Sequence, residues 1–188
     1  MAEIILISGG ARSGKSGYAQ SLAERAGGAR VYLATCPPPG TAGNDDPEME
    51  ARIGRHRSER HGRNWRTVEE SVDPVRALST IPEPVVLVDC LTLWVSNLLF
   101  THGNALTDEL LAERCRELAA ACRKRAGTVV LVTGEVGCGI VPENALARRY
   151  RDLVGRCNQI MGESADRAYL VACGQTLTLK EGGKHEAS

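Results

Sequence analysis

Residues 9–16 have the types and the spacing that bind nucleotide phosphates. They read Gly-Gly-Ala-Arg-Ser-Gly-Lys-Ser, which matches the G-x-x-x-x-G-K-[ST] pattern completely. Glycines let backbone N–H groups turn toward phosphate oxygens, and the helix that follows adds the positive end of its dipole. An ordinary glycine turn is the alternative, but the apolar run before the loop and the amphipathic helix after it favour a nucleotide site. The residues of this predicted site are Gly9, Gly10, Ala11, Arg12, Ser13, Gly14, Lys15 and Ser16.

Two side chains of this loop have specific expected roles. Lys15 is expected to reach the β- and γ-phosphates of the nucleotide, and Ser16 is expected to hold Mg²⁺. An acidic residue follows the apolar run 85–88. Asp89 would face the same loop if its strand is parallel to the first one, and it would then hold Mg²⁺ or its water. The alternative is that Asp89 caps a helix that begins at Leu91.

A histidine lies in the arginine-rich segment 49–61. If this segment is a helix, Arg52, His56 and Arg60 share one face at four-residue spacing, and His61 falls on another face. Neighbouring cations lower the pKa of a histidine and keep its imidazole neutral and nucleophilic, while the same arginines bind phosphate. This pattern suits attack on a nucleotide phosphate. On the residues alone, however, a solvated basic face with a surface histidine is the favoured interpretation.

In the stretch 132–144, the end of the expected strand 128–133 leads into a glycine-rich turn. A helix is expected to start after Pro142, because proline is favoured at helix starts. Ligands of open α/β sheets bind at the carboxyl ends of the strands, so this loop is expected at the same edge as the phosphate loop. A structural turn that uses its glycines for backbone freedom fits the pattern equally well.

Apolar strands alternate with helical patterns along the chain. We expect strands near 3–8, 30–35, 85–89, 128–133 and 167–172, and a last short strand at 175–180. We expect helices near 15–26, 49–61, 91–100, 107–126 and 143–164. This order predicts an α/β fold with a mainly parallel sheet and flanking helices. The segment 36–47 contains four prolines, and a loop of this length is expected to be a flexible cover near the nucleotide.

Length and composition limit the possible classes of protein. The 188 residues are expected to form a single nucleotide-binding domain over 1–180 and a disordered tail over 181–188. A net charge of zero gives no attraction to nucleic acid or to an anionic membrane, and no apolar run is long enough for a membrane span. Seven cysteines without a C-x-x-C pair indicate a reducing cytoplasm rather than disulfides or a zinc site.

These elements together resemble the bifunctional adenosylcobinamide kinase / adenosylcobinamide-phosphate guanylyltransferase family of cobalamin synthesis. The similarity covers the chain from Ile4 to about Lys180 and includes the phosphate loop with Arg12. Residues 51–57, Ala-Arg-Ile-Gly-Arg-His-Arg, resemble the segment that carries the guanylylated histidine of the family. The most specific stretch is 135–144, Glu-Val-Gly-Cys-Gly-Ile-Val-Pro-Glu-Asn.

The resemblance implies two reactions in a RecA-like P-loop NTPase fold. In the first, ATP or GTP, with Mg²⁺, phosphorylates the hydroxyl of the aminopropanol arm of adenosylcobinamide. In the second, GTP transfers GMP to a histidine, and the adenosylcobinamide phosphate takes it up to give adenosylcobinamide-GDP. The family assembles as homotrimers. A monofunctional small-molecule P-loop kinase without a covalent nucleotide intermediate is the alternative.

The resemblance also assigns roles to single residues. By position, His56 is the nucleophile, and Glu69 contacts the guanine nucleotide. Thr35, Arg57 and Arg60 are further nucleotide contacts by the same resemblance. A guanine-nucleotide switch is disfavoured, because the sequence contains no Asn-Lys-x-Asp motif.

Overall fold

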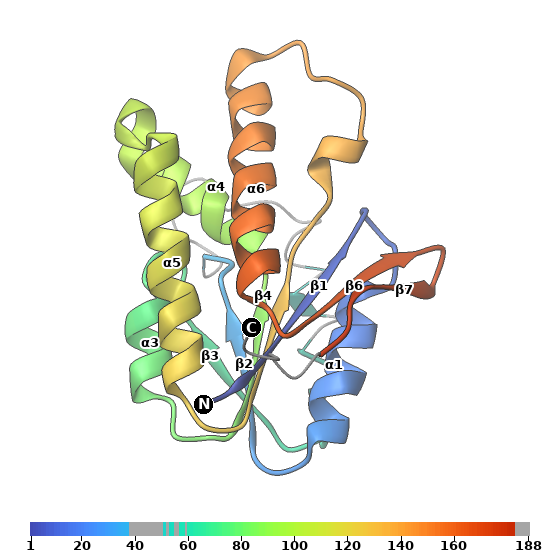
Figure 1. Cartoon of the computed structure of the whole chain (residues 1–188). Helices are drawn as coiled ribbons and strands as arrows, with labels where there is room; N and C mark the ends of the chain where they lie inside the picture. The colour runs from blue at the N-terminus through green and yellow to red at the C-terminus, as the bar shows by residue number, and fades with distance from the viewer. Residues whose placement is uncertain (38–50, 52, 55–56, 59, 183–188) are drawn as a thin grey trace, which may run out of the picture.

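A computed structural model describes residues 1–37, 51, 53–54, 57–58 and 60–182. Within them, seven strands form one sheet in the order β3-β2-β4-β5-β1-β6-β7 (Figure 1). Six strands are parallel, and β7 pairs with β6 in the antiparallel direction. The strands are β1 (Glu3–Gly9), β2 (Arg30–Ala34), β3 (Trp65–Glu69), β4 (Val85–Asp89), β5 (Thr128–Val132), β6 (Arg167–Ala172) and β7 (Gln175–Lys180).

Helices cover both faces of this sheet. One face carries α1, and the opposite face carries α3, α4, α5 and α6 (Figure 1). Described residues between 51 and 60 are also helical. The helices are α1 (Lys15–Ala26), α3 (Pro74–Thr80), α4 (Leu91–His102), α5 (Asp108–Lys124) and α6 (Ala145–Ser164), with short 3₁₀ turns η1 (Gly103–Ala105) and η2 (Val136–Cys138).

The core consists of two apolar layers, one on each side of the sheet. Alternate residues of each strand point to opposite faces. In β5, Val129 and Leu131 therefore pack with the helices α3 to α6, whereas Val130 and Val132 pack with α1. Because both faces are covered, the inner strands are continuous apolar runs rather than alternating ones. Among the described residues, no helix is long and apolar enough to cross a membrane.

The predicted α/β fold with a mainly parallel sheet is confirmed. The six expected strands are present, and α1 and β4 have the expected bounds. Two elements were not expected. The strand β3 lies at the edge of the sheet and is mostly exposed, so it lacks the apolar run that marks the inner strands. The short helix α3 begins at Pro74, and the Asp73 side chain accepts a hydrogen bond from Arg76 N, a start signal that the sequence does contain.

The start of α6 differs from the expected one by two residues. The helix after the glycine-rich loop begins at Ala145 rather than directly after Pro142. Its start is fixed by Asn144, whose Oδ1 accepts hydrogen bonds from Leu146 N and Ala147 N at 2.8 and 3.2 Å. An asparagine cap of this kind satisfies N–H groups of the first helical turn. Most of the expected cover, 38–47, and most of the expected tail, 183–188, lie outside the described residues.

Candidate functional site

The phosphate loop connects β1 to α1 at the carboxyl end of the sheet. Gly9 must be a glycine, because a Cβ atom there would lie 2.4 Å from the carbonyl oxygen of Val171 on β6. Gly14, at the start of α1, has a φ of 97°, a conformation that favours glycine. The ammonium of Lys15 donates a hydrogen bond to Gly10 O at 3.0 Å. The lysine therefore lies against the loop backbone that surrounds the phosphates in such sites.

Neighbouring strand ends support this loop from both sides. Glu135 N donates to Gly9 O at 3.1 Å, and Gly174 N, in the turn between β6 and β7, donates to Ser13 O at 3.1 Å. The Ser13 hydroxyl is buried and has no hydrogen-bond partner among the described residues. A buried polar atom without a partner is rare in folded proteins and needs an explanation. A bound phosphate oxygen would supply the missing partner.

Asp89 lies at the carboxyl end of β4, on the sheet face that carries α1. The hydroxyl of Tyr32 donates to its Oδ2 at 3.0 Å. Burial, and then the negative charge of Asp89, raise the pKa of Tyr32, so the phenol keeps its proton as the donor. The helix α4 has Cys90 at its N-cap position and no side-chain cap, so Asp89 does not cap it. A carboxylate and the hydroxyl of Ser16 are both oxygen ligands of the type that Mg²⁺ prefers.

Arg60 connects the arginine-rich segment to this acidic residue. Its guanidinium carbon lies 3.4 Å from the ring centre of Tyr32, which is a cation–π contact. The side chain is buried, yet Nε and Nη1 have no hydrogen-bond partner among the described residues. A buried cation with unpaired donors is unfavourable unless an acceptor completes it. Arg60 therefore lies on Tyr32, and Tyr32 is in turn hydrogen-bonded to Asp89, so that the three side chains form a stack.

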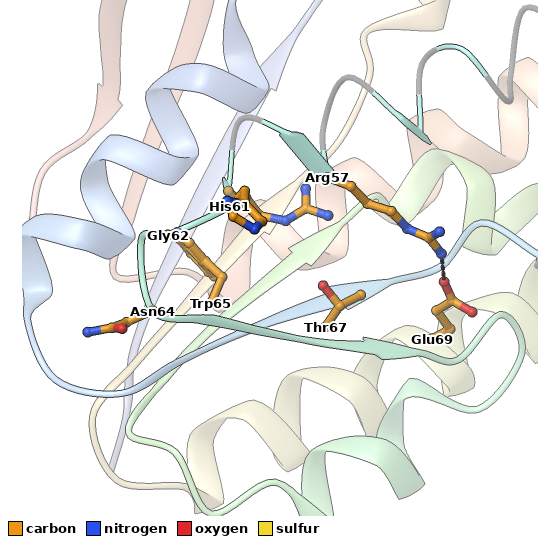
Figure 2. Close-up of a pocket in the computed structure, with 8 residues that line it drawn as sticks. Arg57, His61, Gly62, Asn64, Trp65, Thr67 and Glu69 are labelled. Atoms are coloured by element: carbon orange, nitrogen blue, oxygen red, sulfur yellow. Dashed lines mark hydrogen bonds and ion pairs between the residues drawn. The ribbon is translucent and has the colours of Figure 1, made fainter.

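A cavity of about 610 Å³ lies beside this stack, between the arginine-rich segment and β3 (Figure 2). Trp65, Thr67 and Glu69 are every second residue of β3, and their side chains point to the same face of the strand (Figure 2). Arg57 and Glu69 point toward one another and form an ion pair of 2.6 Å. The lining residues are Arg57, Arg60, His61, Gly62, Asn64, Trp65, Thr67 and Glu69.

The structure therefore brings together three predicted nucleotide contacts, Arg57, Arg60 and Glu69. Thr35, which directly follows β2, does not line this cavity and is fully buried. Its hydroxyl donates to Cys90 O at 2.7 Å and accepts from Cys90 N at 2.8 Å. These hydrogen bonds connect the carboxyl ends of β2 and β4, so Thr35 has a structural role there. The predicted nucleophile His56 lies outside the described residues.

Tyr32 and Asn158 are polar residues at this edge that sequence reasoning did not assign. Asn158 of α6 accepts from the Thr133 hydroxyl at 2.6 Å and donates to Glu135 Oε1 at 3.1 Å. A tyrosine in a buried strand signals the need for a hydroxyl partner, but the sequence does not say which one. The stretch 135–144 was singled out as a motif, without a role for Glu135.

Comparisons with known proteins agree on one family. The family described as cobinamide kinase / cobinamide phosphate guanyltransferase matches residues 5–179. The bifunctional adenosylcobalamin biosynthesis protein CobU of Salmonella typhimurium is 39% identical over 188 residues, which cover 94% of this chain and 99% of that protein. CobU of Escherichia coli K12 is 40% identical with the same coverage. CobP of Pseudomonas aeruginosa is 39% identical over 93% of this chain and 96% of that protein.

A solved structure shows a similar fold. The KaiC-like protein PH0186 from Pyrococcus horikoshii OT3 aligns with a TM-score of 0.55 and 16% identity, over 98% of this chain and 82% of that one. At this identity the likeness concerns the fold alone. It agrees with the predicted α/β fold with a mainly parallel sheet and flanking helices.

Proposed function

The chain belongs to the cobinamide kinase / cobinamide phosphate guanyltransferase family, and from this membership we propose how its residues perform the two reactions. It is a bifunctional cobinamide kinase and guanylyltransferase of adenosylcobalamin biosynthesis. In our proposal, the first reaction phosphorylates the hydroxyl on the aminopropanol arm of adenosylcobinamide. The second transfers GMP from GTP to that phosphate, which gives adenosylcobinamide-GDP and pyrophosphate.

For the kinase reaction, the phosphate loop holds the triphosphate of ATP or GTP. Lys15 binds the β- and γ-phosphates, and the unpartnered hydroxyl of Ser13 supplies a further donor. Ser16 and Asp89 would hold Mg²⁺, and the oxygen chemistry of this pair fits the ion. When bound, Mg²⁺ screens the negative charge of the phosphates. The loop positions the γ-phosphoryl group, which is most of what a protein contributes to this transfer.

For guanylyl transfer, His56 is the nucleophile. Its imidazole nitrogen forms a bond to the α-phosphorus of GTP as the bond to the pyrophosphate oxygen breaks. A phosphate oxygen of the cobinamide phosphate then attacks the same phosphorus and releases the imidazole. Arg57 and Arg60 stabilise the added negative charge. The stack of Arg60, Tyr32 and Asp89 carries this proposal, because it connects Arg60 of the arginine-rich segment to the acidic end of β4.

Glu69 provides a means of selecting guanine. A carboxylate accepts hydrogen bonds from the N1–H and the amino group of guanine, and adenine lacks this pair of donors. In the structure Glu69 pairs with Arg57 at the exposed rim of the cavity. An exposed ion pair of this kind contributes little to stability, so a base can replace or share it at low cost. GTP is therefore the proposed donor of the second reaction.

The proposal includes a cytoplasmic homotrimer. Seven scattered cysteines without a C-x-x-C pair suit a reducing compartment. Three large apolar side chains are exposed, Phe100 by 88%, Ile140 by 96% and Val141 by 61%. Apolar surface of this kind supports contact with a second copy of the chain or with a bulky acceptor. Light scattering of the purified protein tests the proposed assembly directly.

Transfer of label from GTP to the protein tests the nucleophile. Incubation with Mg²⁺ and GTP labelled at the α-phosphate is expected to label the chain with an acid-labile, alkali-stable adduct. His56→Ala is expected to remove the label. His61→Ala is the matched control, because His61 lines the cavity but is expected to leave labelling intact. Labelled His56→Ala protein, or loss of label only in His61→Ala, would contradict the assignment.

A further inference from the structure

A glutamate lies beside the phosphate loop without a role in the proposal above. The strand β5 lies between β4, which ends at Asp89, and β1, which leads into the loop. Its ladder with β1 continues beyond the strand, since Thr133 N donates to Ile7 O and Glu135 N donates to Gly9 O. Figure 1 shows η2, which follows Glu135, at the same end of the sheet as the turn between β1 and α1. Glu135 is therefore about one strand spacing, ~4.8 Å, from the start of the loop.

The side chain of Glu135 is held in place by α6. Asn158 Nδ2 donates to Glu135 Oε1 at 3.1 Å and to Gly134 O at 3.1 Å. Asn158 Oδ1 accepts from the hydroxyl of Thr133, which is fully buried, at 2.6 Å. Both ends of the Asn158 amide are thus used, which fixes its orientation. Among the described residues, Oε2 of Glu135 has no hydrogen-bond partner, so the carboxylate can accept a further hydrogen bond.

At the carboxyl end of the strands, Glu135 and Asp89 lie on opposite faces of the sheet. Thr133 and Glu135 continue the row of Val129 and Leu131, which faces α6. Asp89 continues the row of β4 that faces α1, the helix that follows the phosphate loop. The same edge therefore presents nucleotide-binding groups on one side and a held carboxylate on the other. In a phosphoryl transfer the acceptor approaches the γ-phosphorus from the side opposite to the leaving group, and a carboxylate held at this end of the sheet is available to accept the proton of that acceptor.

We propose that Glu135 is the catalytic base of the kinase reaction and that Asn158 is its positioning residue; this inference rests on the proposed function. The carboxylate of Glu135 accepts the proton of the acceptor hydroxyl. As the hydroxyl oxygen forms its bond to the γ-phosphorus, the bond from phosphorus to the β–γ bridging oxygen breaks, and the nucleoside diphosphate leaves with the electron pair. The proton passes from Glu135 to solvent after the product leaves.

The guanylyl transfer does not need this base. A neutral imidazole attacks through a lone pair and has no proton to lose at the attacking nitrogen. The acceptor of the second reaction is a phosphate oxygen, which is already ionised near neutral pH. Removal of the carboxylate should therefore separate the two reactions, whereas a general disturbance of the phosphate loop would impair both. This difference is the basis of the test.

Glu135→Gln keeps the size of the side chain and an oxygen that can accept from Asn158, but it removes the base. We expect kcat for phosphorylation of cobinamide by labelled nucleotide to fall by about 10²- to 10⁴-fold, the usual range for a general base. The KM for the nucleotide and the labelling of the protein by α-labelled GTP should stay within about twofold of wild type. Asn158→Ala should lower the kinase kcat less, by about tenfold, since the base remains but is no longer held.

The controls separate failure of this inference from failure of the proposed function. Glu113→Gln, at an exposed position of α5, should leave both reactions unchanged. Wild type without cobinamide kinase activity would refute the activity on which the inference rests, and the inference with it. An active wild type together with a Glu135→Gln kcat within threefold would refute the base alone. Equal loss of kinase activity and of protein labelling in Glu135→Gln would also refute it, because that result indicates a structural role.

Discussion

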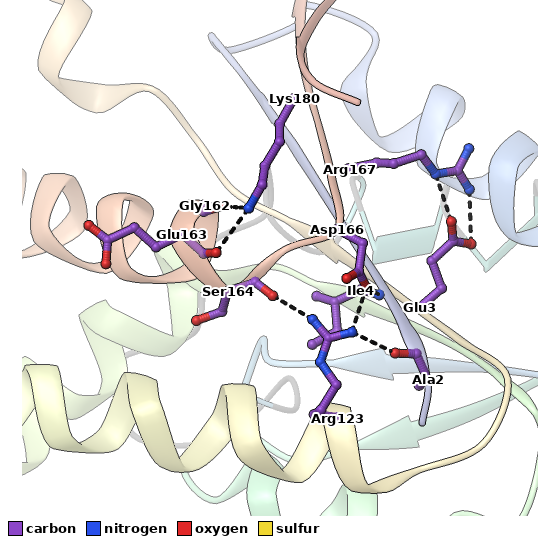
Figure 3. Close-up of polar contacts among 10 residues, drawn as sticks. All are labelled: Ala2, Glu3, Ile4, Arg123, Gly162, Glu163, Ser164, Asp166, Arg167 and Lys180. Atoms are coloured by element: carbon purple, nitrogen blue, oxygen red, sulfur yellow. Dashed lines mark hydrogen bonds and ion pairs between the residues drawn. The ribbon is translucent and has the colours of Figure 1, made fainter. Parts of the chain in front are cut away.

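The two ends of the sheet use their charged residues differently. At the end where the strands begin, Arg123 donates to Asp166 Oδ2 at 2.7 Å, to Ala2 O at 3.0 Å and to Ser164 O at 2.8 Å (Figure 3). Toward the end where they finish, the Tyr32 hydroxyl donates to Asp89, and Arg60 lies over the Tyr32 ring; Arg60 is buried, and two of its donor atoms have no partner among the described residues. Arg123 thus has three hydrogen-bond partners within the protein, whereas two donor atoms of Arg60 have none among the described residues.

The paired end joins distant parts of the chain. Asp166 Oδ2 also accepts from Ile4 N at 2.7 Å, so one carboxylate connects β1, α5 and the turn before β6. Beside it, Arg167 forms an ion pair with Glu3 at 2.8 Å (Figure 3). Such contacts close long loops of the chain, and they hold the sheet together where no ligand is expected. This end therefore contributes stability.

In our proposal, the end where the strands finish instead keeps ligand-binding groups in position before the ligand arrives. Ser13 and Arg60 retain buried polar atoms without hydrogen-bond partners among the described residues, which costs stability in the protein alone. The Nε atoms of Arg30, Arg125 and Arg167, near the starts of β2, β5 and β6, are also without such a partner, so the contrast concerns the groups that the proposed function uses. Functional sites often carry such costs, since groups aimed at a ligand cannot also be satisfied internally. The comparison therefore predicts that mutations at one end change activity and that mutations at the other change stability.

The largest expected effect is at the phosphate loop. Lys15→Ala should lower both the kinase and the guanylyl transfer rates by about 10³-fold, because it removes the positive charge from the transferring phosphates. The midpoint of thermal unfolding should change little. Steady-state assays of both reactions and a thermal melt measure this. Lys124→Ala, at an exposed position in the last turn of α5, is the matched control, and equal losses in both variants would break the comparison.

The opposite pattern is expected at the paired end. Asp166→Asn leaves Arg123 without its charged partner and should lower the free energy of unfolding by about 2 kcal/mol, the usual contribution of a hydrogen bond to a charged group. Activity per folded molecule should be unchanged. Urea denaturation and active-site titration measure the two quantities. Glu117→Gln, which breaks the exposed pair with Arg114, should cost less than about 0.5 kcal/mol.

The stabilisation by Asp166 should also depend on pH. Burial alone would raise the pKa of Asp166, but the hydrogen bonds from Arg123 and Ile4 N outweigh it and lower that pKa. A carboxylate whose folded pKa is lowered stabilises the protein above its unfolded pKa of about 3.9 and loses that contribution as the pH falls through the folded pKa. The difference between wild type and Asp166→Asn should therefore shrink below about pH 4. A difference that grows on acidification would contradict this linkage.

The smallest expected effect tests the link within the functional end. Tyr32→Phe keeps the ring under Arg60 but removes the hydrogen bond to Asp89. We expect both reactions to slow by about tenfold, because Asp89 loses a group that orients it. Tyr169→Phe is the control, since the Tyr169 hydroxyl meets Arg167 only at 3.5 Å. If Tyr32→Phe destabilises the protein without slowing either reaction, the stack of Arg60, Tyr32 and Asp89 contributes stability rather than activity. That result would contradict the proposed difference between the two ends of the sheet.

Much of the fold and part of the site could be predicted from the sequence. The phosphate loop, α1 and the inner strands follow from local spacing, because a glycine pattern and an apolar run each encode their own conformation. The loop pattern also predicts Lys15 and Ser16 as site residues, and the family resemblance predicts Arg57, Arg60 and Glu69 as nucleotide contacts. The strand β3 was missed, since an exposed edge strand needs its neighbour β2 to define it.

Only the tertiary structure decided how the polar groups pair. Tyr32 and Asp89 are 57 residues apart in the chain, and Glu135 and Asn158 are 23 apart. Whether such residues meet depends on the order of the strands, which places β5 between β4 and β1. Local sequence specifies conformation over a few residues, but strand order results from the burial of both sheet faces at once. The proposed chemistry of the phosphate loop therefore follows from a local sequence pattern, whereas the side-chain pairs around the loop depend on the packing of the whole sheet.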